Sequence, residues 1–261
     1  SAGELSTSVG LAPAKTYTLN LVATDSSGAS NGTSSKTILV KTGSDATTGV
    51  TGPLSGGAND DLIYGNTYAR YIYIEGLDGN DTVFGQGGPD VIYGDSGNDR
   101  LFGDEGNDFL FGGDADDTLY GGAGADELDG GIGNDVIYGG TDGDYADGYA
   151  GDDHIFGEDG NDYLYGYAGN DTLNGGAGDD RLFGDAGNDT LVGAAGSDRF
   201  IYNSLTSLSD IGVDRIEDFY RGQDKIVLDN ALFSALNNPS VDFMLASQFT
   251  LMTASATAVA A

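Results

Sequence analysis

Apolar side chains recur at every ninth residue through more than half of this chain. From Gly56 to Ile201 the sequence divides into blocks such as GDSGNDRLF (94–102) and GDEGNDFLF (103–111), and the eighth residue of each regular block is apolar. A short strand would turn that side chain to one face and its two neighbours to the other. One such unit buries too little to fold alone, so the short period predicts a solenoid whose stacked units share one thin core.

The blocks keep their register in two runs. Residues 56–64 form one block and fourteen more follow from 76 to 201, while GNTYARYIYIE (65–75) reads as a block with a two-residue insertion. If two blocks make one coil, the strands of alternate blocks pair in parallel about 4.8 Å apart. We therefore expect an all-β fold: a right-handed parallel β-roll (solenoid) of about eight coils, with N-terminal β-hairpin strands and a C-terminal β cap.

Glycine and aspartate occupy fixed places between these strands. Position one is Gly and position six is Asp in all fifteen regular blocks, and position four is Gly in twelve of them. We expect the glycines at positions one and four to supply the positive φ angles of a tight turn. Stacking then places the position-six carboxylates in two files, with neighbours about 5 Å apart. These aspartates are Asp61, Asp81, Asp90, Asp99, Asp108, Asp117, Asp126, Asp135, Asp144, Asp153, Asp162, Asp171, Asp180, Asp189 and Asp198.

The two files of carboxylates require a cation. The chain has 42 acidic and 10 basic residues and a formal net charge of −32, so adjacent carboxylates repel one another. The turns offer only oxygen ligands, and flexible cages of six to eight oxygens suit Ca²⁺ better than Mg²⁺. With no Cys and one His, soft and transition-metal sites are disfavoured. The expected cofactor is therefore Ca²⁺.

The blocks resemble the calcium-binding nonapeptide of RTX (repeats-in-toxin) proteins, GGxGxDxUx. The resemblance covers residues 56–201 and implies that each Ca²⁺ lies between the turns of blocks i and i+2, held by backbone carbonyls and two position-six aspartates. One edge then pairs successive aspartates from Asp61/Asp81 to Asp171/Asp189, and the other from Asp90/Asp108 to Asp180/Asp198. The glycines that it assigns to the sites are Gly76, Gly79, Gly94, Gly97, Gly103, Gly106, Gly121, Gly124, Gly130, Gly133, Gly157, Gly160, Gly166, Gly169, Gly175, Gly178, Gly184 and Gly187.

These pairs predict roughly ten to thirteen ions. Thirteen divalent ions would bring 26 positive charges and leave a net charge of about −6, an ordinary value for a soluble protein. Three turns replace the position-four Gly, with Asn59, Ala115 and Asp142. In the insertion block Arg70 aligns with the aspartate. These departures weaken the assignment at their turns, and we expect the second file to begin only at Asp90.

The flanking segments divide the chain further. Residues 1–42 contain two alternating runs, at 15–25 and 36–41, that predict β-strands. They resemble the end of a bacterial cadherin-like or immunoglobulin-like module; the alternative is a hairpin that caps the roll. Residues 43–55 are Gly/Ser/Thr-rich and read as a linker. Residues 202–261 are expected to form a C-terminal cap and a possible secretion-signal region.

The C-terminal cap has a recognisable motif. VDRIEDFYRGQDKIVLD (213–229) is similar to the segment that follows RTX rolls and closes their end, and a solenoid needs such a cap because its last coil exposes core. At the other end the chain starts at Ser1 without Met or a leader, so we expect it to be an excised or processed piece.

Position nine carries aromatic residues in ten of the fifteen regular blocks. On one sheet they should stack as an unbroken ladder that stabilises a flat parallel sheet. The alternative is an exposed strip that binds a glycan, a neighbouring domain or a second copy. The ten residues are Tyr64, Phe84, Tyr93, Phe102, Phe111, Tyr120, Tyr138, Phe156, Tyr165 and Phe183.

Several functions are disfavoured by what the sequence contains. His154 lies at position seven, where a side chain should be solvated, and no HExxH motif is present. The regular carboxylates belong to the turns, so we expect no enzyme activity and no catalytic residue in this chain. The charge of −32 argues against nucleic acid, and no apolar run approaches the roughly 18 residues of a membrane span.

The RTX resemblance implies a secreted protein, extracellular or at the cell surface. Such a chain leaves the cell through a type I secretion apparatus and folds in millimolar calcium outside, where it serves as a folding, secretion and spacing module of a larger protein. Two alternatives remain. One is an adhesin or S-layer fragment that binds a glycan or partner through its aromatic face. The other is the accessory C-terminal module of a secreted hydrolase, protease or polysaccharide-modifying enzyme.

Overall fold

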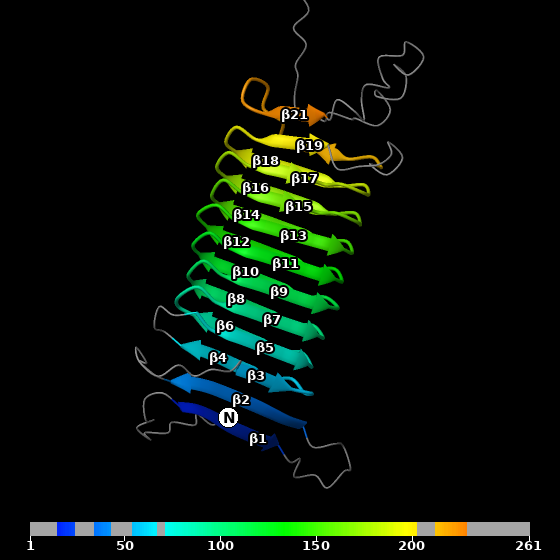
Figure 1. Ribbon diagram of the computed structural model, residues 1–261. Coiled ribbons are helices and arrows are strands. Elements are labelled where there is room, and N and C mark those ends of the chain that lie inside the picture. The colour runs from blue at the N-terminus through cyan, green and yellow to red at the C-terminus, as the bar shows by residue number, and fades with distance from the viewer. Residues whose placement is uncertain (1–14, 24–33, 43–53, 67–70, 203–211, 229–261) are drawn as a thin grey trace, which may run out of the picture.

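A computed structural model describes residues 15–23, 34–42, 54–66, 71–202 and 212–228 of the 261. These residues build a straight stack of coils that runs from β1 at one end to β21 at the other (Figure 1). The described residues form strands and turns and contain no helix. Accordingly, this part of the chain has no helix of the length and apolarity that crossing a bilayer requires.

Two β-sheets enclose the core. Sheet A has eleven strands in the order β1-β2-β4-β6-β8-β10-β12-β14-β16-β18-β20, and sheet B has ten in the order β21-β19-β17-β15-β13-β11-β9-β7-β5-β3. The strands of sheet A are β1 (Lys15–Ala23), β2 (Ser34–Thr42), β4 (Leu62–Asn66), β6 (Thr82–Gln86), β8 (Arg100–Glu105), β10 (Thr118–Ala123), β12 (Val136–Thr141), β14 (His154–Asp159), β16 (Thr172–Ala177), β18 (Thr190–Ala195) and β20 (Arg215–Ile216). Those of sheet B are β3 (Leu54–Gly57), β5 (Tyr73–Asp78), β7 (Val91–Ser96), β9 (Phe109–Asp114), β11 (Glu127–Ile132), β13 (Tyr145–Ala150), β15 (Tyr163–Tyr165), β17 (Arg181–Phe183), β19 (Arg199–Tyr202) and β21 (Lys225–Leu228).

Each coil of the roll contains two blocks. Strands pair in parallel with a shift of eighteen residues, as in Leu119↔Ile137 between β10 and β12, and the chain crosses from one sheet to the other at every turn. The result is a parallel β-solenoid of about eight coils, which confirms the predicted fold class.

Position eight forms the core, as predicted. From Ile63 through Leu119 to Phe200 these side chains are fully buried in every regular block, because each lies in register with the apolar side chain of the coils above and below. Position seven points outward: His154, for example, is exposed. The alternation of buried and outward-facing positions therefore follows from the pleat of the strand, in which successive side chains point to opposite faces.

The N-terminal strands extend sheet A. β1 and β2 pair antiparallel, and β2 pairs in parallel with β4, with Leu39 in register with Ile63. The hairpin therefore lies against the first coil of the roll, and the resemblance to the end of a cadherin-like module stays a prediction. β3 already belongs to sheet B, and Leu54 is buried in the core. The roll therefore starts two residues earlier than expected, and the rest of the expected linker lies outside the described residues.

The insertion block differs from the predicted alignment. β5 pairs with β7 so that Tyr73 lies opposite Val91, which places Ile72 in register with Asp90. The residue at the aspartate position is thus the buried Ile72 and not Arg70, because the two extra residues precede it. The second file begins at Asp90, as expected.

The C-terminal segment closes the roll by imitating a repeat. Ile216 of β20 lies opposite Leu191 of β18, and Ile226 of β21 lies opposite Phe200 of β19, so both continue the core column. The Phe219 ring packs on Phe200 with centroids 6.2 Å apart. The predicted cap is therefore present, whereas the possible secretion signal lies outside the described residues.

The aromatic ladder on sheet A is also present. Ring centroids from Tyr64 through Phe84, Phe102, Tyr120 and Tyr138 to Phe156 are separated by 4.6–5.1 Å, and successive rings are within 11° of parallel. At position nine, the described strands of sheet B form two short aromatic stacks, Tyr93–Phe111 and Tyr165–Phe183, because Asp129 and Asp147 lie between them.

Candidate metal centres

The position-six aspartates lie at the start of each strand, and all are buried. Their exposed fractions are between 0 and 3% in all fifteen regular blocks. Asp61, Asp81 and every second aspartate after Asp81 precede the strands of sheet A, whereas Asp90 and every second aspartate after Asp90 precede the strands of sheet B. The structure thus forms the two predicted files of carboxylates, one along each edge of the roll.

One oxygen of each carboxylate joins adjacent coils. The Oδ1 of Asp81 accepts a hydrogen bond from the backbone N–H of Asp61 at 2.6 Å, and the Oδ1 of Asp99 accepts one from Asp81 at 2.7 Å. The same bond connects all thirteen predicted pairs, at distances of 2.6–3.0 Å. The structure therefore brings together every pair of aspartates that the repeat pattern predicts.

The other carboxylate oxygen is buried and accepts no hydrogen bond. This Oδ2 has almost no solvent contact in the following aspartates: Asp81, Asp99, Asp108, Asp117, Asp126, Asp135, Asp144, Asp153, Asp162, Asp171, Asp180, Asp189 and Asp198. Burying a carboxylate oxygen without a donor or cation is costly, and the same arrangement recurs in successive coils. These oxygens are thus donor atoms that fit a cation.

Position-one glycines line the space beside these oxygens. A Cβ added to Gly112 would lie 2.5 Å from the Oδ2 of Asp117 and 2.5 Å from the carbonyl oxygen of Gly130 in the next coil. A carboxylate oxygen and a backbone carbonyl therefore border one cradle that a side chain would fill. This donor set, made only of oxygen, is what Ca²⁺ prefers.

The reason for glycine at position one is not the one expected. Position-one glycines such as Gly112 do not have positive φ; the positive φ values fall at positions two and four. Asp95 and Glu158 show φ of 71° at position two, and Gly97 shows 125° at position four. The expectation was right for position four, where all the predicted glycines except Gly160 have positive φ. It was wrong for position one, where close contact with the next coil excludes a side chain.

Two of the irregular turns keep the regular geometry. Ala115 and Asp142 replace the position-four Gly, yet they adopt φ of 83° and 75°. The N–H of Ala115 also donates to the carbonyl of Ile132 at 2.6 Å, the same bond that Gly97 makes with Asp114. These two substitutions strain the backbone and leave the turn in place.

Two aspartates of the cap extend the files beyond the repeats. The Oδ1 of Asp214 accepts from the N–H of Asp189 at 3.0 Å, and that of Asp224 accepts from Asp198 at 3.1 Å. The repeat pattern of nine does not include these two residues in the files. The signal was available, because DRI (214–216) and DKI (224–226) repeat the Asp-x-apolar order of positions six to eight.

Position five adds a ladder that the sequence analysis also missed. The backbone N–H of Asn98 donates to the Oδ1 of Asn80 at 2.8 Å, and that of Asp152 donates to the Oδ1 of Asn134 at 2.9 Å. On the other edge Asp179 bonds Asn161 in the same way at 2.7 Å. The frequent Asn or Asp at position five thus connects the exposed turns of adjacent coils, whereas the aspartate at position six is buried.

Burial raises the pKa values of most file carboxyls when no metal is bound. It raises the pKa of Asp117 and of Asp144 to about 8, with the backbone hydrogen bond offsetting part of the effect and the neighbouring aspartates adding to it. The pKa rises to about 7 for Asp81, Asp126, Asp135, Asp171, Asp180 and Asp189, and to about 6 for Asp99, Asp108, Asp153 and Asp162.

The donors are spread along the edges and do not form one compact cluster. Within the described ranges, no three or more His, Asp or Glu side chains group closely enough to hold a metal by themselves. A cation held on these edges would therefore need the paired carboxylates of adjacent coils together with backbone carbonyls. That is the ligand set that the RTX resemblance implies.

Comparison with known families agrees with this geometry. The family described as RTX calcium-binding nonapeptide repeat (4 copies) matches residues 75–110, 102–137, 111–146, 138–173 and 165–200. The repeats of this chain belong to the RTX family. RTX repeats bind Ca²⁺, so the roll is a calcium-binding β-roll. No curated protein matches the chain.

Replacing a position-one glycine should harm the RTX roll without straining its backbone. We expect Gly112→Ala to lower the free energy of unfolding in millimolar calcium by about 1–3 kcal/mol, because the new methyl group overlaps the Asp117 and Gly130 oxygens. Gly57→Ala is the matched control, since its Cβ would meet only the Oδ2 of Asp61 at 3.6 Å. Equal urea-denaturation midpoints for the two variants would contradict the steric role of position one.

The metal-free RTX roll should gain stability in acid. Twelve of the file carboxyls have folded-state pKa values of about 6 to 8, above the 3.8 of an unperturbed aspartate, so their contribution to stability is full below about pH 4 and is lost as the pH rises through 6 to 8. In EDTA we expect more β-structure by circular dichroism at pH 5.5 than at pH 8. Calcium should restore the structure at pH 8. A metal-free chain that is more structured at pH 8 would contradict the assignment.

Proposed function

We propose that this chain is a calcium-dependent folding module of a larger secreted protein. It remains unfolded in the low calcium of the cytosol, leaves the cell through a type I secretion apparatus, and folds outside in millimolar calcium as a secretion and spacing segment. The observation that carries this proposal is the repeated buried carboxylate oxygen that accepts no hydrogen bond. Such a fold needs a cation, and the extracellular medium supplies one.

The balance of free energies supports coupled folding. Ordering a chain with 45 glycines costs a large conformational entropy, and the core contributes only one apolar side chain per block. Calcium that binds only the folded state adds its binding free energy to folding. The roll is therefore stable only where calcium is abundant.

The proposed ligands follow from the position of each residue. The aspartate files supply carboxylates from adjacent coils, and the turn glycines named above supply backbone carbonyls, of which the position-one carbonyl lies beside the Oδ2 atoms. The repeats provide thirteen intervals between paired aspartates. Asp214 and Asp224 add one interval at each edge, so the cap also takes part in binding calcium.

We also propose that the module has no enzyme activity of its own. His154 is exposed at position seven, and the carboxylates of the turns are committed to the two files. The identity of the larger protein decides between the two alternatives. Tandem cadherin-like domains upstream would make it an adhesin or S-layer protein, whereas a catalytic domain upstream would make it a secreted enzyme.

Calcium stoichiometry tests the ligand assignment. Asp117 belongs to two intervals, with Asp99 and with Asp135, so Asp117→Asn should reduce the number of bound ions by about two in native mass spectrometry of the calcium-loaded chain. Asp116→Asn removes the same charge from the exposed neighbour at position five and should leave the number unchanged. An equal loss in both variants would mean that general acidity, and not the file, holds the ions.

Limited proteolysis tests the proposed role in export. We expect the chain to be cut rapidly within residues 76–201 at micromolar free calcium and to resist cleavage there at millimolar calcium, because extracellular calcium modules bind at about 10⁻⁴–10⁻³ M. Magnesium at the same concentrations should protect poorly. Resistance at micromolar calcium would contradict the proposal, since a roll folded in the cytosol could not be exported as an unfolded chain.

A further inference from the structure

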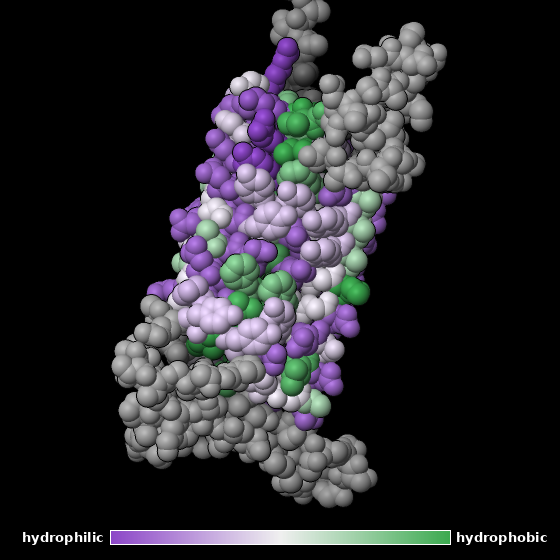
Figure 2. All heavy atoms as spheres, in the orientation of Figure 1, coloured by the Kyte–Doolittle hydropathy of each residue, from purple (hydrophilic) through white to green (hydrophobic). Residues whose placement is uncertain are grey.

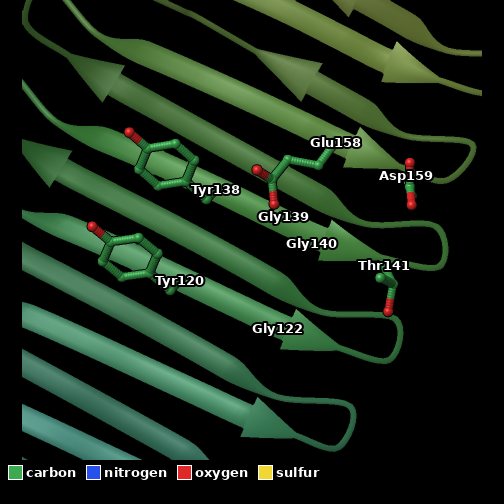
Figure 3. A pocket seen from close by; sticks show the side chains of 8 residues that line it. All are labelled: Tyr120, Gly122, Tyr138, Gly139, Gly140, Thr141, Glu158 and Asp159. Atoms are coloured by element: carbon green, nitrogen blue, oxygen red, sulfur yellow. The ribbon is translucent and has the colours of Figure 1, made fainter.

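The outer face of sheet A is poorly suited to binding a ligand. The Tyr120 ring lies between Phe102 and Tyr138, at 4.7 and 5.0 Å, so both of its faces are covered. Beside it a shallow groove of about 370 Å³ passes over Gly122 and Gly140 (Figure 3). Because the rings of the ladder stack on one another, the groove presents only ring edges to a ligand.

The outer face of sheet B has a different composition. Five tyrosines gather on β13 and β15 and the turn after β15, and we call them the tyrosine patch: Tyr145, Tyr149, Tyr163, Tyr165 and Tyr167. Within it Tyr149 stacks on Tyr167 at 4.9 Å, and Tyr145 contacts Tyr165 at 5.1 Å. Figure 2 shows one face of the roll, where pale side chains of intermediate hydropathy, the class that includes tyrosine, gather over its middle part.

Two of these tyrosines occupy strained backbone positions. Tyr149 and Tyr167 lie at position two with φ of 68° and 66°, where the neighbouring coils of sheet B have Gly113 and Gly131. They are the aromatic residues with positive φ among those described. A bulky side chain is unfavourable in this region of φ, so glycine would suit the fold better. Position two also carries side chains at positive φ in other coils, such as Asp95 and Glu158, so the two tyrosines are distinguished by their stacked rings.

The Tyr149 ring has one open face. One side stacks on Tyr167, and the paired residue on the other side is Gly131, followed one coil further by Gly113. Because Gly131 and Gly113 have no side chains, the surface beside the ring is open, and Tyr149 is 42% exposed. A flat group can therefore stack on this face.

Two carboxylates lie next to this open surface. Asp129 on β11 and Asp147 on β13 are in register at position nine, and Asp129 is half-buried, one outward position along the strand from Gly131. Asp147 is only 8% exposed, and its Oδ1 is buried without a hydrogen-bond partner. The one salt bridge among the described residues is Arg215–Glu217 in the cap, so no basic side chain of this part of the chain pairs with Asp129 or Asp147. Buried adjacent anions favour a positively charged neighbour.

The patch already binds one guanidinium from its own chain. The Cζ atom of Arg181 lies over the Tyr163 ring, 4.6 Å from its centroid. An arginine side chain combines a flat cation that stacks on tyrosine with a fork of donors that matches a carboxylate. These are the two features that the open face of Tyr149 and the Asp129 carboxylate would recognise.

We propose that the tyrosine patch is a docking site for an arginine side chain of a protein partner. The guanidinium stacks on the open face of Tyr149 above Gly131 and donates hydrogen bonds to Asp129, while Asp147 behind it adds negative charge. A neutral saccharide could stack on the ring but would leave the paired carboxylates uncompensated. This inference is independent of the calcium sites and concerns the folded, calcium-loaded roll.

Titration calorimetry of the calcium-loaded full chain tests the proposal. The probes are a short Gly/Ser peptide with a single central arginine and the same peptide with citrulline, which keeps the planar shape and lacks the charge. We expect the arginine peptide to bind and the citrulline peptide to bind at least about tenfold more weakly. Tyr149→Gly and Asp129→Asn should each weaken arginine binding by a similar factor. Tyr149→Gly should also raise the thermal midpoint, because glycine relieves the strained φ.

The matched control removes a charge from the opposite sheet. Asp104 lies at position two of sheet A, so Asp104→Asn should leave arginine binding unchanged within about twofold, because salt screens the attraction between a guanidinium on sheet B and a charge on the opposite sheet. If Asp104→Asn and Asp129→Asn weaken binding equally, the attraction is general and the proposal fails. Equal binding of the citrulline peptide, or no binding of the arginine peptide, would also overturn it; the former would point to a neutral ligand such as a saccharide.

Discussion

The roll depends on how it accommodates a carboxylate buried at every turn. Each position-six aspartate from Asp81 onward uses one oxygen to join its coil to the previous one through a backbone hydrogen bond of 2.6–3.0 Å, and in most blocks the second oxygen lies buried without a donor. The first oxygen makes the stack regular, and the second makes it unstable at neutral pH unless a cation is bound. The proposed metal dependence therefore originates in the same side chain as the regular stacking, so removing the aspartate cannot separate the two.

The other invariant positions follow from this buried carboxylate. Glycine is required at position one because a side chain there would overlap the aspartate oxygen and the carbonyl of the next coil. Position four needs positive φ to bring the chain back within a few residues. Position eight then places one side chain per block in a core only one layer thick, so no single coil is stable alone and the ends need covering. β2 covers one end, and the repeat-like β20 and β21 cover the other.

Most of the repeating structure could be predicted from the sequence, whereas the exceptions could not. Position eight, the aspartate files and the sheet A ladder follow from the period, because every block obeys the same packing. The cause of glycine at position one was predicted wrongly, since a positive φ and a close steric contact both select glycine. Ile72 was missed because an insertion hides the register, and Asp214 and Asp224 because the period of nine ends before them. The tyrosine patch depends on which side chains coincide on adjacent coils at positions two, seven and nine, and the repeat pattern leaves those positions open.

A far-UV circular dichroism titration of the EDTA-stripped chain with calcium, with magnesium in parallel at neutral pH, measures whether the buried carboxylates need the metal in order to fold. If the buried carboxylates need calcium, β-structure should appear cooperatively between micromolar and millimolar calcium and not with magnesium, because the flexible all-oxygen cradles suit the larger ion. A chain that is fully structured at neutral pH without calcium would show that the buried carboxylates do not need the metal, and the aromatic ladder and the two caps would then have to supply the stability.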